Sequence, residues 1–555
     1  MLPDVLYTLV TGNGVRQNVG LPPTPPASLR NYVLVTTIAV ATLANGWSLM
    51  AIPVWIYPDS IDYIQLASGI LEGGNWSNRL WLIRPPGYPL LLASIFTLFG
   101  SASPIALAVF QHILVGCTAI LAALIGWNLT SRVGVALLVG LLCAGSLQLL
   151  AYANLALTEV PYAALLVGIV FLLVGPDARL STRRIAMASA LAGIAYLIKP
   201  IGLYLVGVCT LGAILAANRS RRRLLSGLIA AILPACIMVA PWKAATAITF
   251  GQDDTDRCLD YVLYLRAAEF DRLDSTTSEA MLEIKRVVAE AKSTGDLPKS
   301  ATPRDRATVI KAFESVRGAS FSESTAVMGR AGGDLMREHY PTIALNTMKY
   351  AAWLMLAPDP VYRFVPGGTP GEGGKRAPEA NFYDIATYST GAGSWEHVLR
   401  DHREYLPLDS SPTAATPSWT SLIRAFHTHV DQAPGVIGIA DSLYGELMLA
   451  CGLGGVFCLL GPRRCQWLIP IGVVISHVLI SAFLGGPQTR YAAPIKPLLM
   501  IFGAVFTIRA ADGLKCCLRV ARSLVSDALT RSAKCTGSSI ESASTEMGHI
   551  RGEAL

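Results

Sequence analysis

Long apolar runs recur along this chain and are separated by short polar segments. A helix needs about 20 apolar residues to cross the hydrocarbon core of a bilayer. Runs near that length lie at 32–52, 104–128, 133–151, 157–175, 185–217, 224–243, 436–460, 466–485 and 490–509. The run at 185–217 is too long for one helix, and Lys199-Pro200 divides it into two. The pattern predicts an all-α polytopic membrane protein with about ten transmembrane helices.

Composition and charge agree with this class and give it an orientation. Hydrophobic residues make up 52% of the 555 residues, charged residues make up 15%, and mean hydropathy is +0.46, which is too apolar for a soluble protein. Much of the net charge of +7 lies in short loops on one side of the predicted spans. Because Lys- and Arg-rich short loops stay in the cytoplasm, we expect a multi-pass plasma (inner) membrane protein with both termini cytoplasmic. Anionic lipid accounts for the positive charge without a nucleic-acid partner.

The spans also predict how the chain is divided. Residues 1–31 lack the pattern of a cleavable signal and are predicted to form a cytoplasmic tail. An N-terminal transmembrane module (32–243) contains the first exterior loop (53–103). It is followed by an extracytoplasmic loop and helical region, by C-terminal transmembrane helices and by a cytoplasmic tail, at 244–435, 436–510 and 511–555. The last tail has the pattern of a basic amphipathic helix on the inner leaflet.

Amphipathic patterns predict helices in the exterior region at 278–292, 304–317 and 321–338. The apolar face of the first consists of Met281, Leu282, Ile284, Val287, Val288 and Ala291. The run at 341–357 is long enough to span, but a span there would place Arg463-Arg464 outside, against the charge rule. We therefore predict an interfacial or partly inserted helix. Gly, Pro, Ser and Thr are frequent in 358–420, which is predicted as a loop that orders over a substrate.

Charged side chains at the exterior ends of the spans are the candidate chemical groups. Asp59 follows the first span, and Arg84 begins the segment Arg84-Pro85-Pro86-Gly87-Tyr88-Pro89 before the next one. Arg84, Lys199 and Arg490 each lie near a Pro on the side that short-loop cations tend to avoid. Structural roles are the alternatives. Asp59 or Ser60 would cap a helix that begins near Ile61, and the cations would reach to lipid head groups.

Other charged residues are weaker candidates. Asp62 is expected to face another side of the same helix as Asp59. Glu159 could orient an acceptor, support Lys199 or Arg84, or help to hold a divalent cation. The alternative is an ordinary helix start with Thr158 as the cap. No metal site is predicted, because the exterior histidines have no zinc-motif spacing and are interpreted as loop residues: His339, His397, His402, His427 and His429.

Several of these segments resemble one family. Asp59-Ser60 with Tyr63, the Arg84 to Leu90 segment with Tyr88, Leu157-Thr158-Glu159-Val160-Pro161, Leu197-Ile198-Lys199-Pro200 and Thr489-Arg490-Tyr491-Ala492-Ala493-Pro494 follow one another in the order seen in GT-C membrane glycosyltransferases. The resemblance is to the bacterial branch similar to protein O-mannosyltransferases and aminoarabinose–lipid A transferases, and it covers about 32–243 and 436–510. The middle of the chain has no such resemblance.

The resemblance implies an inverting glycosyltransferase. Such enzymes move a sugar from a polyprenyl-phosphate carrier to a lipid, polysaccharide or protein acceptor on the extracytoplasmic face. Asp59 would be the catalytic base, Arg84, Lys199 and Arg490 would bind the phosphate, and Tyr63, Tyr88, Glu159 and Tyr491 would complete the substrate site. No cofactor is predicted beyond the candidate divalent cation. A transporter or flippase of a lipid-linked sugar, a lipid-linked oligosaccharide polymerase or ligase, and a catalytically silent scaffold remain alternatives.

Overall fold

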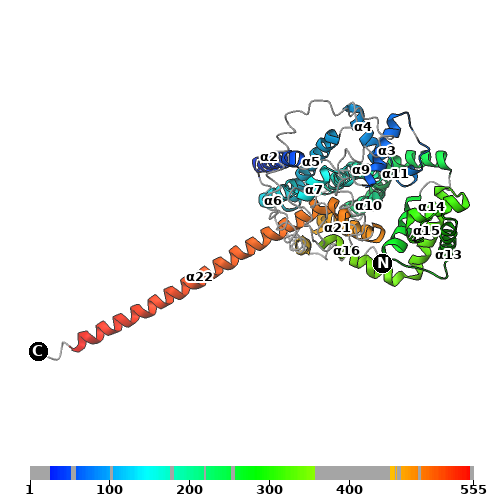
Figure 1. Ribbon diagram of the computed structural model, residues 1–555. Helices are drawn as coiled ribbons and strands as arrows, with labels where there is room; N and C mark the ends of the chain where they lie inside the picture. Colours follow the sequence, from blue (N-terminus) through cyan, green and yellow to red (C-terminus); the bar gives the residue numbers. More distant parts are fainter. Residues whose placement is uncertain are drawn as a thin grey trace.

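The chain folds into a bundle of apolar helices with a smaller helical unit beside it (Figure 1). The computed structural model describes residues 26–51, 58–74, 76–99, 104–175, 180–217, 220–251, 257–356, 451–456, 458, 464–485 and 489–550. Every regular element within these ranges is a helix, which agrees with the predicted all-α class. The loop at 358–420, most of the predicted span at 436–460, and four of the exterior histidines lie outside the described residues.

The helices of the bundle follow the predicted apolar runs. In chain order they are α2 (Ala27–Ala51), α5 (Pro104–Thr130), α6 (Val133–Ala144), α7 (Leu147–Ala153), α8 (Glu159–Leu173), α9 (Thr182–Ile198), α10 (Tyr204–Ala217), α11 (Arg221–Phe250), α21 (Arg464–Gly485) and α22 (Lys496–Ile550). The predicted break at Lys199-Pro200 is confirmed, because α9 ends at Ile198 and a 3₁₀ turn, η2 (Pro200–Leu203), precedes α10.

The chain is a multi-pass membrane protein, and its helices differ in length. Among the described residues, six helices are long and apolar enough to cross a bilayer, or seven if the bent pair α6 and α7 counts as one span. The 15 residues of α8 and the 17 of α9 fall short of that length. Both of these helices pack against several others in the bundle. The expectation of about ten spans therefore counted apolar runs that include these shorter helices.

Residues 257–338, called the side unit here, form a second compact group of helices with its own apolar core. It contains α12 (Arg257–Tyr264), the π-helical turn η4 (Leu265–Phe270), α13 (Glu279–Thr294), α14 (Arg306–Arg317) and α15 (Phe321–Glu338). The three helices predicted for this region are confirmed. On α13 the predicted apolar residues are buried except Leu282, which is 40% exposed. Leu282 is exposed because it lies on the side of the amphipathic helix that faces solvent.

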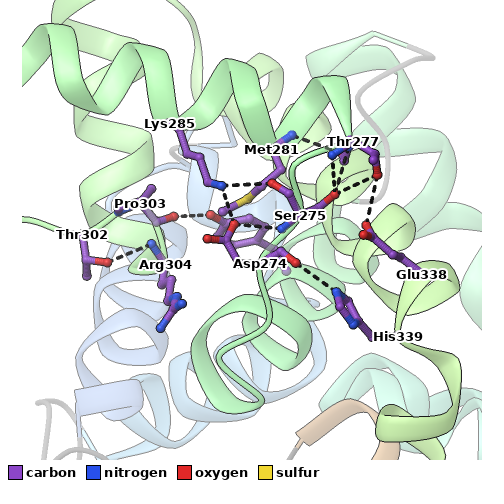
Figure 2. A network of polar contacts seen from close by, with 12 residues as sticks. Asp274, Ser275, Thr277, Met281, Lys285, Thr302, Pro303, Arg304, Glu338 and His339 are labelled. Carbon is purple, nitrogen blue, oxygen red and sulfur yellow. Dashed lines mark hydrogen bonds and ion pairs between the residues drawn. The ribbon is translucent and has the colours of Figure 1, made fainter.

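Polar contacts shape the loop that leads into α13 (Figure 2). The Ser278 hydroxyl accepts from the Met281 amide and so caps the helix. Lys285 pairs with Asp274 at 2.6 Å, and His339 donates through Nε2 to the Asp274 carbonyl at 2.9 Å. Because a carbonyl only accepts, the imidazole donates here and connects the C-terminal end of α15 to this loop.

The side unit is joined to the bundle by hydrogen bonds that both members of a buried ion pair within the unit make to neighbouring helices. Arg266 donates through Nη1 to Asp271 at 2.6 Å, and neither side chain is exposed to solvent. Arg266 also donates to the Phe483 carbonyl of α21 at 2.9 Å. Asp271 accepts from Tyr350 at 2.8 Å on α16 (Tyr340–Leu356). The joint therefore fixes the side unit to two helices at once, α16 and α21.

The structure also describes the run at 341–357 and the segment after 510. The run at 341–357 is one helix, α16, which packs against α21 and against η7 (Thr489–Ile495); its interfacial position stays a prediction. The basic helix predicted after 510 is continuous with the last span, and no Pro interrupts 498–550; its position on the inner leaflet stays a prediction. Figure 1 shows α22 projecting far from the bundle. Its basic residues and exposed Leu514 and Leu518 lie along this projecting part.

Candidate active site

The acidic part of the candidate site comes from α3 (Pro58–Leu71), which begins one residue before Asp59. Arg84 follows the 3₁₀ turn η1 (Arg79–Leu82) and donates through Nη2 to Asp59 Oδ1 at 2.7 Å. Its Nε and Nη2 also donate to Asp62 Oδ2, at 3.1 and 2.9 Å. The expectation that Asp62 faces away from Asp59 is therefore wrong. Residues three apart lie on one face of a helix, so a single guanidinium reaches both carboxylates.

Close packing brings the Arg84 turn to the end of α9. Gly87 begins α4 (Gly87–Leu98), and a Cβ at this position would lie 2.6 Å from the Leu197 carbonyl oxygen. Only glycine permits this approach between two backbones. Lys199 comes next in the chain after α9 and is extended (φ −148°, ψ 115°), as the residue before a proline prefers. The two cations thus reach the same end of the bundle from separate helices.

Arg490 completes the pairing of Asp59. It lies in the 3₁₀ helix η7, and its Nη2 is 2.7 Å from Asp59 Oδ2. Asp59 therefore has one guanidinium on each carboxylate oxygen. The helix-cap role considered for Asp59 does not describe this geometry, because both oxygens point to arginines from distant segments.

Lys199 and Glu159 form a buried pair next to this group. Lys199 Nζ donates to Glu159 Oε1 at 3.0 Å, and the two side chains are 11% and 3% exposed. Thr158 precedes α8 but makes no side-chain cap; its hydroxyl is directed to Glu159 Oε2 at 3.4 Å. Of the roles considered for Glu159, the structure shows contact with Lys199. Because Glu159 is buried, its carboxylate holds the Lys199 ammonium group at a fixed place inside the protein by a charge-assisted hydrogen bond.

Aromatic rings connect the two halves of the cluster. The Tyr491 ring lies 4.7 Å from Lys199 Nζ and 5.3 Å from the Arg490 guanidinium carbon. The Tyr63 ring lies 5.1 Å from the guanidinium carbon of Arg84 and meets Tyr88 edge to face at 5.0 Å. All of the residues predicted for the site are therefore brought together by contacts among themselves. Cations over ring faces are held in place while they keep hydrogen-bond donors for other partners.

Burial and charge shift the pKa values of Asp59 and Asp62 in opposite directions. Burial alone would raise the pKa of Asp59, but the charges and hydrogen bonds of Arg84 and Arg490 hold it well below its usual value. Burial raises the pKa of Asp62, and the single guanidinium of Arg84 does not offset that effect. Burial would lower the pKa of Arg84, but Asp59 and its neighbours raise it. Asp59 is thus a firmly ionised carboxylate within a balanced set of charges.

One further polar residue lies against the site and was not predicted. His477 is buried in α21, and its Nε2 is 2.6 Å from the carbonyl oxygen of Tyr491. The signal available in the sequence was a histidine in the middle of an apolar span, which is rare without a partner. Among the described residues, no group of three or more His, Cys, Asp or Glu side chains could hold a metal ion.

Comparison with known proteins finds similar structures but no similar sequences. No protein-family model and no curated protein sequence matches the chain. The similar solved structures include an oligosaccharyltransferase from Archaeoglobus fulgidus with Zn and sulfate (11% identity, TM-score 0.42), which is matched over 89% of this chain and 50% of the other. They also include the oligosaccharyltransferase AglB of the same organism with an inhibitory peptide and a dolichol-phosphate. Its sequence identity is 11% and its TM-score is 0.42, over 89% of this chain and 52% of the other.

A third similar structure is ArnT from Cupriavidus metallidurans bound to undecaprenyl phosphate, at 14% identity and a TM-score of 0.36 over 87% of this chain and 79% of the other. These proteins are GT-C membrane glycosyltransferases, the superfamily of the sequence resemblance. The chain spans about half the length of the oligosaccharyltransferases that it matches. A functional proposal therefore has to stand on the contacts of this chain's own residues.

Proposed function

We propose that the protein is an inverting glycosyltransferase that moves a sugar from a polyprenyl-phosphate carrier to an acceptor on the extracytoplasmic face. The observation that carries this proposal is the position of Asp59 between two guanidinium groups at one end of the bundle. Two arginines and a lysine within one contact network suit a phosphate, which arginine binds with parallel hydrogen bonds. The Asp59 carboxylate between them suits a base that takes the proton of an acceptor hydroxyl or amine.

Charge balance supports exchange of the carboxylate for a phosphate. Asp59, Asp62 and Glu159 face Arg84, Arg490 and Lys199, so the negative and positive groups are equal in number. A donor phosphate that takes over the guanidinium groups would leave Asp59 without its strongest partners. Arg84 would stay in place during this exchange, because Asp62 holds it through two hydrogen bonds. Lys199, oriented by Glu159, would supply a third positive charge.

The proposed reaction is a single displacement at the anomeric carbon. An acceptor hydroxyl or amine attacks from the face opposite the phosphate, and its proton passes to the Asp59 carboxylate. The bond from the anomeric carbon to the phosphate oxygen breaks, and the electron pair leaves with the phosphate. Attack and departure on opposite faces invert the configuration. Arg84, Arg490 and Lys199 stabilise the charge that develops on the leaving phosphate.

The proposed orientation follows from the charge of the loops. Arg132 and the arginines at the start of α11 lie at the opposite end of their helices from the site. Since basic short loops stay in the cytoplasm, the site faces outward and both termini face inward. The lipid chain of the donor would approach from the bilayer, and the acceptor would approach from the aqueous side.

A transfer assay tests the proposal. Membranes that contain the native protein are incubated with radiolabelled polyprenyl-phosphate sugars, and the products are fractionated. We expect a new glycoside with the native protein and a loss of about 100-fold or more with Asp59→Asn, the scale of general-base catalysis. Asp512→Asn is the matched control, because this carboxylate pairs with Arg132 away from the site.

Three results would change the proposal. Equal transfer by Asp59→Asn and the native protein would remove Asp59 from the base role. Label that crosses sealed vesicles without forming a glycoside would show transport of the lipid-linked sugar instead. Transfer that requires a lipid-linked oligosaccharide would identify a polymerase or ligase.

A further inference from the structure

His477 occupies a position from which it can set the geometry of the candidate phosphate site. It lies inside α21, and only 1% of its surface is exposed. Its Nε2 is 2.6 Å from the Tyr491 carbonyl oxygen, and its Nδ1 is 3.1 Å from the Tyr204 hydroxyl. The Tyr162 and Tyr204 rings flank the imidazole, with centroids at 5.9 and 5.7 Å. Partners therefore fix the ring in position and in rotation.

The hydrogen-bond partners determine how the imidazole is protonated when it is neutral. A backbone carbonyl can only accept, so Nε2 carries the hydrogen and donates to Tyr491. Nδ1 of the same neutral ring has a lone pair, and it accepts from the Tyr204 hydroxyl. This assignment follows from the chemistry of the partners. It makes the histidine a link between α10, which begins at Tyr204, and η7.

The link matters because η7 holds two residues of the site. Arg490 is the residue before Tyr491 and pairs with Asp59 at 2.7 Å. The Tyr491 ring receives Lys199 Nζ at 4.7 Å. A 3₁₀ helix makes hydrogen bonds of poorer geometry than an α-helix, so it needs support from outside to keep one conformation. His477 supplies such support at the Tyr491–Ala492 peptide group, directly after Arg490 and at the residue whose ring receives Lys199.

We propose that His477 is a positioning residue that holds η7 through the Tyr491 carbonyl and so places Arg490 and Lys199 for a lipid-linked phosphate. The proposal rests on the function proposed above. It adds that phosphate affinity depends on a residue that does not touch the phosphate. The imidazole reaches the cations of the site through the backbone of Tyr491, so its loss should change binding of the donor rather than binding of the acceptor.

Substitutions separate the hydrogen bond from the packing. His477→Phe keeps a ring of similar size between the two tyrosines but has no N–H. His477→Gln keeps an N–H group near the position of Nε2. His339→Phe is the matched control, because His339 also donates to a carbonyl, that of Asp274 at 2.9 Å, in the side unit. The control variant removes the same kind of bond in the side unit, where His339 bonds to the loop before α13 rather than to η7.

The first measurement is the Kd of a fluorescent polyprenyl phosphate for the detergent-solubilised full-length protein, with the KM values of donor and acceptor beside it. We expect His477→Phe to raise the Kd and the donor KM about 10-fold, which corresponds to about 1.4 kcal/mol and matches one buried hydrogen bond. The acceptor KM should stay unchanged, His477→Gln should recover most of the affinity, and His339→Phe should bind like the native protein.

The second measurement is hydrogen–deuterium exchange of the amides in 489–495, which reports on η7 without any substrate. We expect faster exchange in His477→Phe and near-native exchange in His477→Gln. An unchanged Kd in His477→Phe would overturn the inference whatever its exchange. Failure of the native protein itself to bind polyprenyl phosphate would refute the proposed function, and unchanged exchange in 489–495 would then refute the positioning of η7 separately.

Discussion

The joint between the side unit and the bundle allows a quantitative prediction. Arg266 and Asp271 are both fully buried and are 2.6 Å apart. Removal of one partner of a buried ion pair costs about 3–5 kcal/mol, because the other charge is left without compensation. Arg266→Met would also remove the donors to Phe483 and Thr347. We therefore expect the upper half of that range for opening of the joint.

The chain provides a matched comparison in Lys285 and Asp274. This pair is also 2.6 Å apart, but its side chains are 31% and 47% exposed. Exposed ion pairs contribute about 0–1 kcal/mol, so Lys285→Met should have little effect. The difference between the two variants reports burial together with the hydrogen bonds that Arg266 makes to Phe483 and Thr347, because the separation of the charges is the same in both pairs.

Hydrogen–deuterium exchange can read this difference directly. If opening of the joint exposes the amides of 265–271 and 343–350, Arg266→Met should speed their exchange by about three to three and a half orders of magnitude, at about 1.4 kcal/mol for each factor of ten. The double variant Arg266→Met/Asp271→Leu should recover much of the protection, since no buried charge is left alone. Equal acceleration by Arg266→Met and Lys285→Met would show that the buried pair does not hold the side unit against the bundle.

Three shorter predictions concern the site. Gly87→Ala should separate α4 from α9 and abolish most transfer at unchanged expression, because its Cβ would lie 2.6 Å from the Leu197 carbonyl; activity near the native level would contradict this packing. Arg490→Lys should weaken polyprenyl-phosphate binding about 10-fold in a direct titration, since lysine lacks the paired donors of arginine, and native affinity would exclude a phosphate contact. Asp59 must be ionised to act as a base, so activity should fall as pH falls. Once Arg490 turns to the phosphate, it no longer lowers the pKa of Asp59, so the acid limb of kcat should lie at higher pH than that of kcat/KM; coincident limbs would argue against the exchange.

Much of the fold was accessible from the sequence, because apolar runs and amphipathic periods are local signals. The break at Lys199-Pro200 and the helices of the side unit were predicted from such signals. The number of spans was less accessible, because the apolar runs at 157–175 and 185–217 contain helices of only 15 and 17 residues, α8 and α9. Helix length inside a packed bundle depends on neighbours rather than on composition.

The site was partly predictable for a related reason. Cations at the exterior ends of spans are anomalies that a sequence displays, and the structure brings them together around Asp59. The role of Asp62 was missed although the three-residue spacing already placed it on the same helix face as Asp59. The contact of His477 with Tyr491 could not be derived, because it depends on the packing of α21 against η7.

We propose that Arg84, Lys199 and Arg490 form one phosphate site next to Asp59. An experimental structure of the protein with bound polyprenyl phosphate would show whether they do. We expect phosphate oxygens within hydrogen-bonding distance of both guanidinium groups, with Arg490 withdrawn from Asp59. A phosphate bound elsewhere in the bundle, with both arginines still on Asp59, would rule this site out.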